Sequence, residues 1–185
     1  MDIRIEKTER AIRNAFLELR AAKPLEKITV KELCSLACIN KSTFYSHYED
    51  IYALSQMLES ETITTVIKNI SRQQESPFKD PDVFTRNLYM ALVSNHSLIN
   101  ILFSGTEKSH IGDCLETELK RLIVEKYPQY ETDPEKDSML SFCMQGCFHA
   151  YLNNQKNDLD TLIHVSETIV RKLAPLYIEE RREDE

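Results

Sequence analysis

An all-α fold is predicted for this chain by three features of its sequence. Glycine is scarce, with 3 among 185 residues. Leu, Ile, Glu and Lys recur at helical intervals, and no long segment alternates apolar and polar residues as a half-buried strand would. Residues that favour helix starts also stand before several of these segments. We therefore expect a bundle of helices with enough chain to bury a substantial core.

The first helix is expected from Thr8 to Arg20. Pro24 follows it and stops the helix. Four apolar residues fall on one stripe against a charged outer face: Ile5, Ile12, Phe16 and Leu19.

A second, short helix is expected to begin near Val30. Thr29 and Glu32 have the spacing of a capping box, in which the hydroxyl accepts from a backbone amide and the carboxylate reaches back. The inward-facing residues would then be Leu33, Leu36 and Ala37. The Thr29 hydroxyl and the first amides of this helix could also contact a phosphate.

A third helix is expected to start at Asn40, a strong N-cap, and to end near Ser46 or His47. Phe44 would fill the core beneath it. Two short helices joined by a tight turn make a helix-turn-helix, whose second helix can enter the DNA major groove. The sequence therefore predicts a DNA-reading head.

The first fifty residues resemble the TetR family of bacterial transcription regulators. The matching features are the amphipathic first helix, Pro24, Ile28 to Val30, Glu32, Leu33, Ala37, the run from Asn40 to Tyr48, and Leu54. The rest of the chain resembles the family only in length and helical texture. The resemblance implies a homodimer, a palindromic operator on double-stranded DNA and a larger helical domain for dimerisation and effector binding.

Two positions depart from the family pattern. Cys38 stands where the turn usually has Gly, so the turn must accept a side chain. Ile51 stands where a Lys often opens the fourth helix, and Glu49 and Asp50 precede it. These carboxylates suit a helix N-terminus but repel phosphate, so we expect weaker or altered operator binding.

Charged residues are also distributed unevenly between the N-terminal head and the rest of the chain, here called the body. Residues 3–48 carry nine Lys and Arg against five Asp and Glu, whereas residues 49–185 carry fourteen against twenty-four. A basic head on an acidic body suits a protein of which only the head approaches phosphate. We expect a DNA-binding domain over residues 1–49 and a ligand-binding and dimerisation domain over residues 50–185. The expected DNA contacts are Thr29, Lys31, Lys41, Ser42, Thr43, Tyr45 and His47. Lys41 and Thr43 are expected to make base or mixed contacts, and Tyr45 and His47 to contact phosphate.

The body is expected to hold six further helices. Asp-Pro pairs at Asp80 and Asp133 should open two of them, since Pro is favoured at the first helical position. A loop is expected at Glu75 to Asp80, and Gly105 and Pro128 should act as breaks. The expected helices are Asp50 to Gln73, Asp82 to Ser94, Ser97 to Phe103, Glu107 to Tyr127, Glu135 to Asn153 and Leu159 to Tyr177, with Pro175 near the end and a frayed tail from Glu179 to Glu185.

The last two helices carry stripes suited to a dimer interface. Small residues on the first of them allow close approach of another helix, and pairing with symmetry mates would give a four-helix interface, as in the family. The alternative is that both stripes are core within one chain. The expected interface residues are Cys143, Gly146, Cys147, Ala150, Leu162, Ser166, Ile169 and Leu173.

Aromatic, Met and His residues of the body could line a pocket for an unidentified apolar or aromatic effector. For any single one of them, ordinary packing competes with this interpretation. The candidates are Tyr52, Met57, Phe84, Tyr89, Met90, His96, Phe103, His110, Phe142 and Phe148.

Other functions find little support in the sequence. The five cysteines lack the spacing of a zinc knuckle or a disulfide framework, so we expect buried thiols rather than metal or redox sites. No catalytic motif, cofactor or metal site is expected. No segment reaches the ~20 apolar residues that span a bilayer, so a cytoplasmic location is expected. An interaction protein with secondary DNA binding is the alternative to a repressor.

Overall fold

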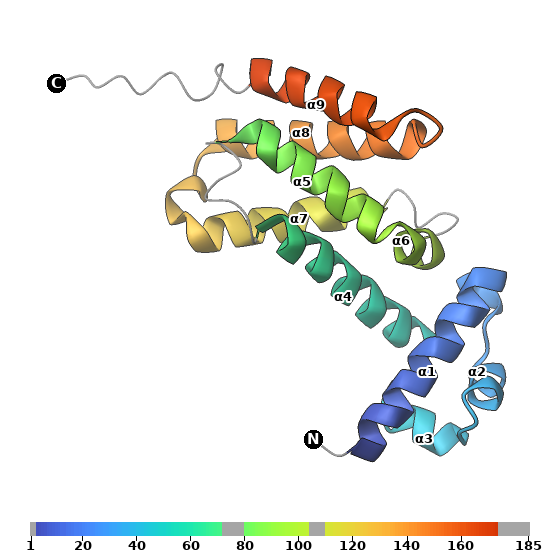
Figure 1. Ribbon diagram of the computed structural model, residues 1–185. Helices are drawn as coiled ribbons and strands as arrows, with labels where there is room; N and C mark the ends of the chain where they lie inside the picture. Colours follow the sequence, from blue (N-terminus) through green and yellow to red (C-terminus); the bar gives the residue numbers. More distant parts are fainter. Residues whose placement is uncertain (1–2, 72–79, 104–109, 174–185) are drawn as a thin grey trace. The chain divides into compact units, whose positions relative to one another are not determined.

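The structure is a computed structural model that describes residues 3–71, 80–103 and 110–173. These residues form α-helices and two short 3-10 turns, with no strand among them (Figure 1). The helices are α1 (Ile3–Ala22), α2 (Val30–Leu36), α3 (Lys41–Tyr45), α4 (Ile51–Ser71), α5 (Pro81–Ser94), α6 (His96–Leu102), α7 (His110–Lys126), α8 (Pro134–Asn153) and α9 (Leu159–Leu173), and the turns are η1 (Leu25–Lys27) and η3 (Pro128–Tyr130). The predicted all-α fold is confirmed.

The chain divides into two compact units. The first takes its described residues from 1–62 and 97–108, and the second from 63–96 and 109–185. Most of α6 therefore groups with α1, α2 and α3, although four α-helices separate it from α1 along the chain. The functional boundary expected after residue 49 stays a prediction.

The first unit is built around the inner face of α1. Ile12 and Phe16 are fully buried, as the apolar stripe predicts. Ile5 is 46% exposed, because it lies near the start of a helix that begins five residues earlier than expected. Leu36 is 43% exposed, because the buried stripe of α2 centres on Leu33 and Cys34 and leaves Leu36 at its edge.

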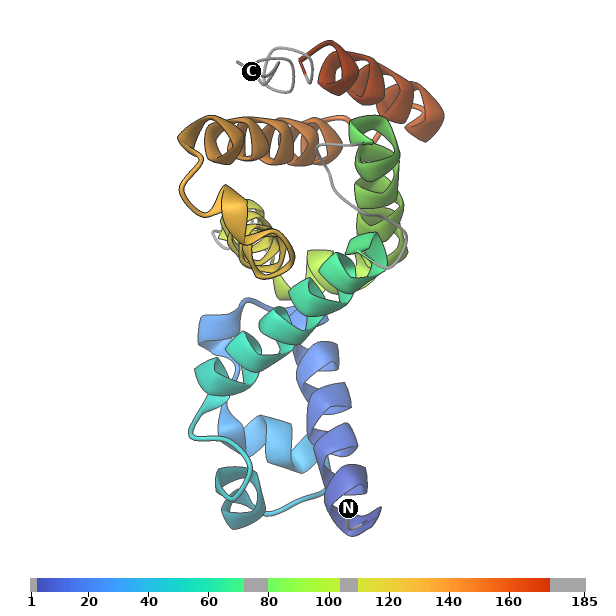
Figure 2. The same ribbon diagram turned by 90° about the vertical axis from the view of Figure 1, so that its left-hand side faces the viewer.

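In the second unit α5 packs on α9, α7 packs on α8, and α8 lies antiparallel beside α9 (Figures 1 and 2). Tyr89 joins three of these helices. Its hydroxyl lies 2.8 Å from the Ser166 Oγ of α9 and donates to the Cys147 carbonyl of α8 at 3.1 Å. Burial raises the pKa of Tyr89 to about 12, although the bond with Ser166 acts in the opposite direction.

The contact between α7 and α8 depends on a glycine. A Cβ at Gly112 would lie 2.8 Å from Gln145 Oε1 and 2.9 Å from Phe148 Cδ1. Lys120 also bridges the two helices, with Nζ 3.0 Å from Glu116 and 2.7 Å from Asp137. This pair of helices is therefore held by close approach and by ion pairs.

The caps predicted for the second unit are confirmed in part. Asp133 caps α8 by accepting from the Lys136 amide at 3.1 Å, with Pro134 next to it. Asp80 precedes Pro81 of α5 as expected, but its side chain makes no capping hydrogen bond. Several predictions lie outside the described residues: the loop 75–79, the break at Gly105, the helix start at Glu107, the bend at Pro175 and the tail from Glu179.

Candidate nucleic-acid interface

The helix-turn-helix is formed by α2 and α3. Thr29 caps α2 by accepting from the Glu32 amide at 3.3 Å, and Asn40 caps α3 by accepting from the Thr43 amide at 2.7 Å. Phe44 has no exposed surface. Both predicted caps and the predicted core anchor are therefore confirmed, and they fix α3 against the rest of the first unit.

The second half of the expected capping box is wrong. The Glu32 carboxylate accepts from Lys23 Nζ instead of reaching back to the Thr29 amide. A charged ammonium group is a stronger partner for a carboxylate than a neutral amide, and Lys23 at the end of α1 is within reach.

The turn between α2 and α3 contains a residue with a left-handed backbone conformation. Cys38 has φ of 55°, the only positive φ at a non-glycine residue in the described part of the chain. Its side chain is exposed, and the Ile39 amide still donates to the Cys34 carbonyl at 3.0 Å. The turn thus keeps its geometry without the glycine that would adopt it at no steric cost.

The outward face of α3 is polar and internally hydrogen-bonded. Lys41 and Ser42 are exposed, and Thr43 is half-buried. The hydroxyls of Ser42 and Thr43 donate to Asn40 Oδ1 at 2.7 and 2.8 Å. The same oxygen also accepts from the Thr43 amide. Both hydroxyls therefore offer lone pairs rather than protons to any outside group.

Tyr45 and His47 lie in different surroundings. Tyr45 is 56% exposed, and its ring meets the Phe44 ring edge to face at 5.5 Å. The His47 side chain is only 16% exposed, with Nδ1 3.5 Å from the Glu9 carboxylate of α1. Tyr45 is thus open to a ligand, whereas His47 faces α1. At the start of α2, Thr29 and Lys31 are both exposed.

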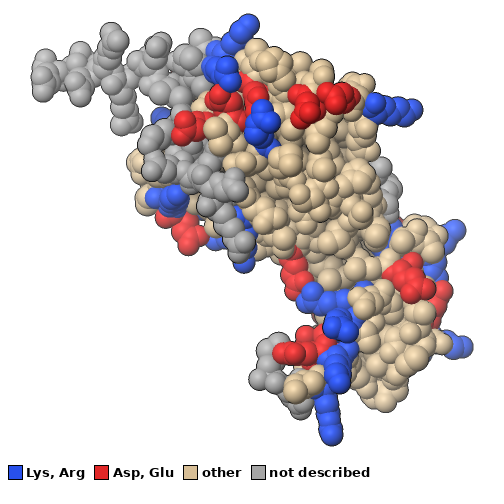
Figure 3. All heavy atoms as spheres, in the orientation of Figure 1, with Lys and Arg blue, Asp and Glu red and all other residues tan. Residues whose placement is uncertain are grey.

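The residues that lead into α4 are those that depart from the family pattern. Asp50 caps α4 by accepting from the Ala53 amide at 2.7 Å, as its position predicts. Ile51 is 5% exposed and belongs to the core, so it presents no polar group to a phosphate. Figure 3 shows Lys and Arg side chains on the visible face of the first unit, with carboxylates between them.

Two contacts that brace this unit are absent from the predictions. Arg13 of α1 donates to both carboxylate oxygens of Glu61 on α4, at 2.5 and 2.7 Å. Arg20 is 4% exposed and donates to the Leu102 carbonyl of α6 at 3.2 Å. Arg20 is the last residue of the predicted first helix, but nothing local in the sequence marks it as buried.

The expected interface residues of α8 and α9 fall into three groups: buried, exposed and partly exposed. Cys147 and Ser166 are buried beside Tyr89 and belong to the core of the second unit. Gly146 is exposed, with no atom within 4 Å of a Cβ placed on it, and Ile169 is 52% exposed. The other four are partly exposed: Cys143, Ala150, Leu162 and Leu173. Phe142, at 67%, and Val165, at 48%, add exposed apolar surface to the same two helices.

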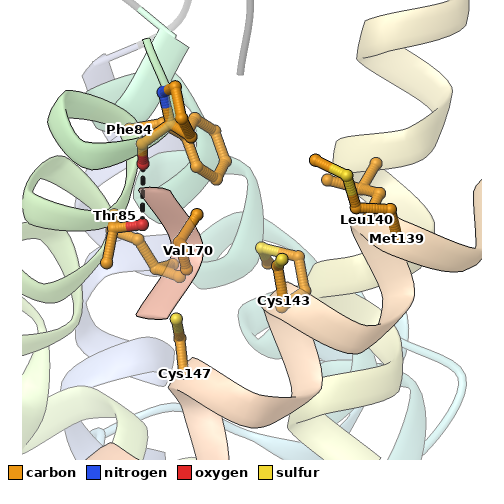
Figure 4. Close-up of a pocket in the computed structure, with 10 residues that line it drawn as sticks. Phe84, Thr85, Met139, Leu140, Cys143, Cys147 and Val170 are labelled. Atoms are coloured by element: carbon orange, nitrogen blue, oxygen red, sulfur yellow. Dashed lines mark hydrogen bonds between the residues drawn. The ribbon is translucent and has the colours of Figure 1, made fainter. Parts of the chain in front are cut away.

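The expected effector residues do not gather around one space. Phe84 lines a cavity of about 20 Å³ between α5, α8 and α9 (Figure 4). Tyr89, Phe103 and Phe148 are buried, Met57 and His96 are half-buried, and four are exposed: Tyr52, Met90, His110 and Phe142. His96 accepts or donates a 2.7 Å bond with the Tyr151 hydroxyl, which gives it a structural partner. The cavity is also lined by Met139, which no prediction names, and by Cys143, which is expected at the dimer interface.

No three His, Cys, Asp or Glu side chains are grouped to hold a metal ion within the residues described. Among the helices described, none combines the length and the apolar character needed to cross a membrane.

Comparison with solved structures identifies the fold. The chain is similar to a TetR-family transcriptional regulator from Streptomyces coelicolor, with 10% sequence identity and a TM-score of 0.62; the match covers 97% of this chain and 86% of that one. A TetR transcriptional regulator from Rhodococcus sp. RHA1 matches with 15% identity, a TM-score of 0.49 and coverage of 97% and 99%. No protein-family model and no curated protein sequence matches. The first likeness shows that this chain has the fold of that regulator.

Proposed function

We propose that this chain is a dimeric TetR-like transcriptional regulator, a repressor that occupies a palindromic operator and is released by a small molecule. The observation that carries the proposal is α3, an exposed polar helix held by buried Phe44 and by the Asn40 cap. Side chains fixed in this way can meet base edges without first losing conformational freedom. Lys41 and Thr43 would make base or mixed contacts, with Ser42 beside them. Tyr45 would contact phosphate.

His47, Thr29 and Lys31 complete the proposed contact set. Thr29 and Lys31 are exposed at the start of α2 and suit phosphate contacts. His47 would reach phosphate only by leaving Glu9. We therefore expect the smallest contribution from His47.

The exposed apolar side chains of α8 and α9 support dimerisation. Phe142, Val165 and Ile169 are each about half exposed or more, and such a patch favours burial against another protein surface. A second copy of this chain would bury the same patch twice, and two heads would then meet half-sites ~34 to 36 Å apart. The modest positive charge of one head also favours a pair.

An effector would act by favouring a dimer with the wrong head spacing. The cavity of about 20 Å³ is far smaller than the roughly 300 to 1,000 Å³ of typical ligand sites. An organic effector would have to widen it.

The test is binding to DNA fragments selected from a random pool by the full chain. Replacing Lys41 by Ala should weaken binding and reduce its salt dependence, because one positive charge close to the DNA phosphates is lost. Lys156→Ala is the matched control, since Lys156 is an exposed lysine of the second unit and its loss changes the net charge equally. Thr43→Val should alter the preferred sequence rather than the overall affinity.

Failure to enrich any fragment in a salt-dependent manner would contradict the proposal. Co-purification of a different protein on the α8–α9 surface would then favour the interaction protein. That alternative draws on Ile51, which is buried where a basic residue would hold phosphate.

A further inference from the structure

Two hydroxyls in the first turn of α3 share a single acceptor. The Asn40 side chain accepts from the Thr43 amide at 2.7 Å, which identifies the accepting atom as Oδ1 rather than Nδ2. The Ser42 and Thr43 hydroxyl oxygens lie 2.7 and 2.8 Å from the same atom. Because a carbonyl oxygen carries no hydrogen, each hydroxyl must be the donor. A hydroxyl that turned its proton outward would set its lone pairs against those of Oδ1 at hydrogen-bond distance.

This arrangement determines what the two hydroxyls can bind outside the protein. A hydroxyl has one proton and two acceptor lone pairs, so Ser42 and Thr43 can accept a hydrogen bond from DNA but cannot donate one. Phosphate oxygens are themselves acceptors and offer no proton. In the major groove the donors are the amino groups of adenine and cytosine, whereas guanine and thymine present acceptors there. Ser42 is exposed and Thr43 is half-buried, so both are accessible to a base edge.

We infer that Asn40 is a specificity-determining residue, which makes Ser42 and Thr43 select adenine or cytosine over guanine or thymine at the base they face. The inference rests on the proposed operator binding. Asn40 acts as a positioning residue, because it affects the DNA through the two hydroxyls. A guanine or thymine oxygen placed against these hydroxyls would leave two acceptors without a donor. Lys41 beside them is exposed and only donates, so it suits guanine.

The test starts from the operator that the full chain selects from a random DNA pool. Each adenine of the half-site is replaced by purine, or each cytosine by 2-pyrimidinone, since these bases lack only the amino group. The analogue also weakens base pairing, so the quantity measured is the coupling between analogue and protein variant in a double-mutant cycle. An amino group should couple to Ser42→Ala, and the same or a neighbouring one to Thr43→Val. Each coupling should be about 5- to 10-fold in Kd, the strength of one hydrogen bond.

Substitutions of Asn40 separate its effect on base preference from its effect on the helix. Gly is accepted at an N-cap with little loss of stability, but it frees both hydroxyl protons. Asn40→Gly should therefore reduce the preference for adenine or cytosine over guanine or thymine at the identified position by about fivefold. Asn40→Asp keeps an acceptor for both hydroxyls, so it should retain this preference while its negative charge weakens binding to all sequences. A residue that only capped α3 would change affinity without changing the preference.

Ser94→Ala is the matched control, since Ser94 of α5 is exposed and its hydroxyl donates to the Met90 carbonyl at 2.7 Å. It should couple to no amino group and keep the wild-type preference. The inference is wrong, while operator binding stands, if an enriched operator couples to neither hydroxyl variant or if folded Asn40→Gly keeps the preference. If no fragment is enriched in a salt-dependent manner, operator binding and this inference fail together. Circular dichroism confirms folding, and the Ser42 and Thr43 variants decide the question if Asn40→Gly is unfolded.

Discussion

The face of α3 and the outer face of α8 and α9 are both exposed, but they differ in chemistry. On α3 the exposed groups are polar, and Ser42 and Thr43 are held by Asn40 Oδ1. On α8 and α9 the exposed groups include Phe142 and Ile169, at 67% and 52%. A fixed polar surface suits a partner with many hydrogen-bonding groups, whereas an apolar surface gains most from burial against another protein. One chain thus presents two surfaces for two kinds of partner.

The two regions also differ in what supports them. On α3 the buried residue is Phe44, in a unit whose core also holds the fully buried Ile12 and Phe16 of α1. Beneath α8 the support is a close helix contact at Gly112 and a hydrogen-bond group around Tyr89. The following substitutions test these supports, from the largest expected effect to the smallest.

Phe44→Ala should lower the free energy of unfolding by about 3 to 5 kcal/mol, because it leaves a cavity under α3. Tyr45→Ala is the control on the same helix, since Tyr45 is 56% exposed, and should change stability by no more than about 0.5 kcal/mol. Denaturant unfolding measures both. If both variants lost the same free energy of unfolding, the stability of α3 would not depend on Phe44 in particular.

Gly112→Ala should destabilise the chain by about 1 to 3 kcal/mol, since the new methyl group would overlap Gln145 and Phe148. Gly146→Ala on α8 meets nothing within 4 Å in the single chain, so it should stabilise the monomeric chain by up to about 1 kcal/mol. Thermal unfolding at one protein concentration checks both. Destabilisation by Gly146→Ala would instead indicate that another surface covers Gly146.

Tyr89→Phe should cost about 0.5 to 1.5 kcal/mol at neutral pH, because Ser166 and the Cys147 carbonyl lose a partner. Burial raises the pKa of Tyr89 from 10.0 to about 12, so its contribution is complete below pH 10 and is lost as the pH rises toward 12. The stability difference between wild type and variant should therefore shrink across this range, by no more than about 1.4 kcal/mol per pH unit. A constant difference in urea unfolding from pH 9 to 12 would refute this assignment.

Removing the Arg13–Glu61 pair should cost about 0.2 to 1 kcal/mol, because both side chains are partly solvated. A double-mutant cycle with Arg13→Ala and Glu61→Ala measures the coupling, which should fall with added salt. The more exposed Arg121–Glu125 pair, within α7, is the comparison and should show a weaker coupling than Arg13–Glu61.

Local signals made the first unit predictable. The caps at Thr29 and Asn40 each involve an amide three residues away, so sequence spacing alone reveals them. The burial of Phe44 is likewise predicted from its position in the short helix that Asn40 caps. The Lys23–Glu32 pair was missed because it joins two helices, and a capping pattern says nothing about a competing partner from outside.

The second unit was harder to predict, because a helical stripe does not reveal its partner. Cys147 and Ser166 lie on expected interface stripes, yet both pack against Tyr89 within the chain. Phe142 was grouped with candidate effector residues by its aromatic character, but it points to solvent. Which way each helix turns is decided by the neighbours it meets, and those lie far away in the sequence.

The bond from Arg20 to the Leu102 carbonyl limits how this protein can be divided. Cutting the chain after Thr62 would remove α6 and the acceptor that it gives to a guanidinium only 4% exposed. Residues 1–62 are therefore a poor choice of fragment to transfer into another protein. A chimaera that keeps the segment from residue 97 to 103 alongside them should retain the native packing of α1.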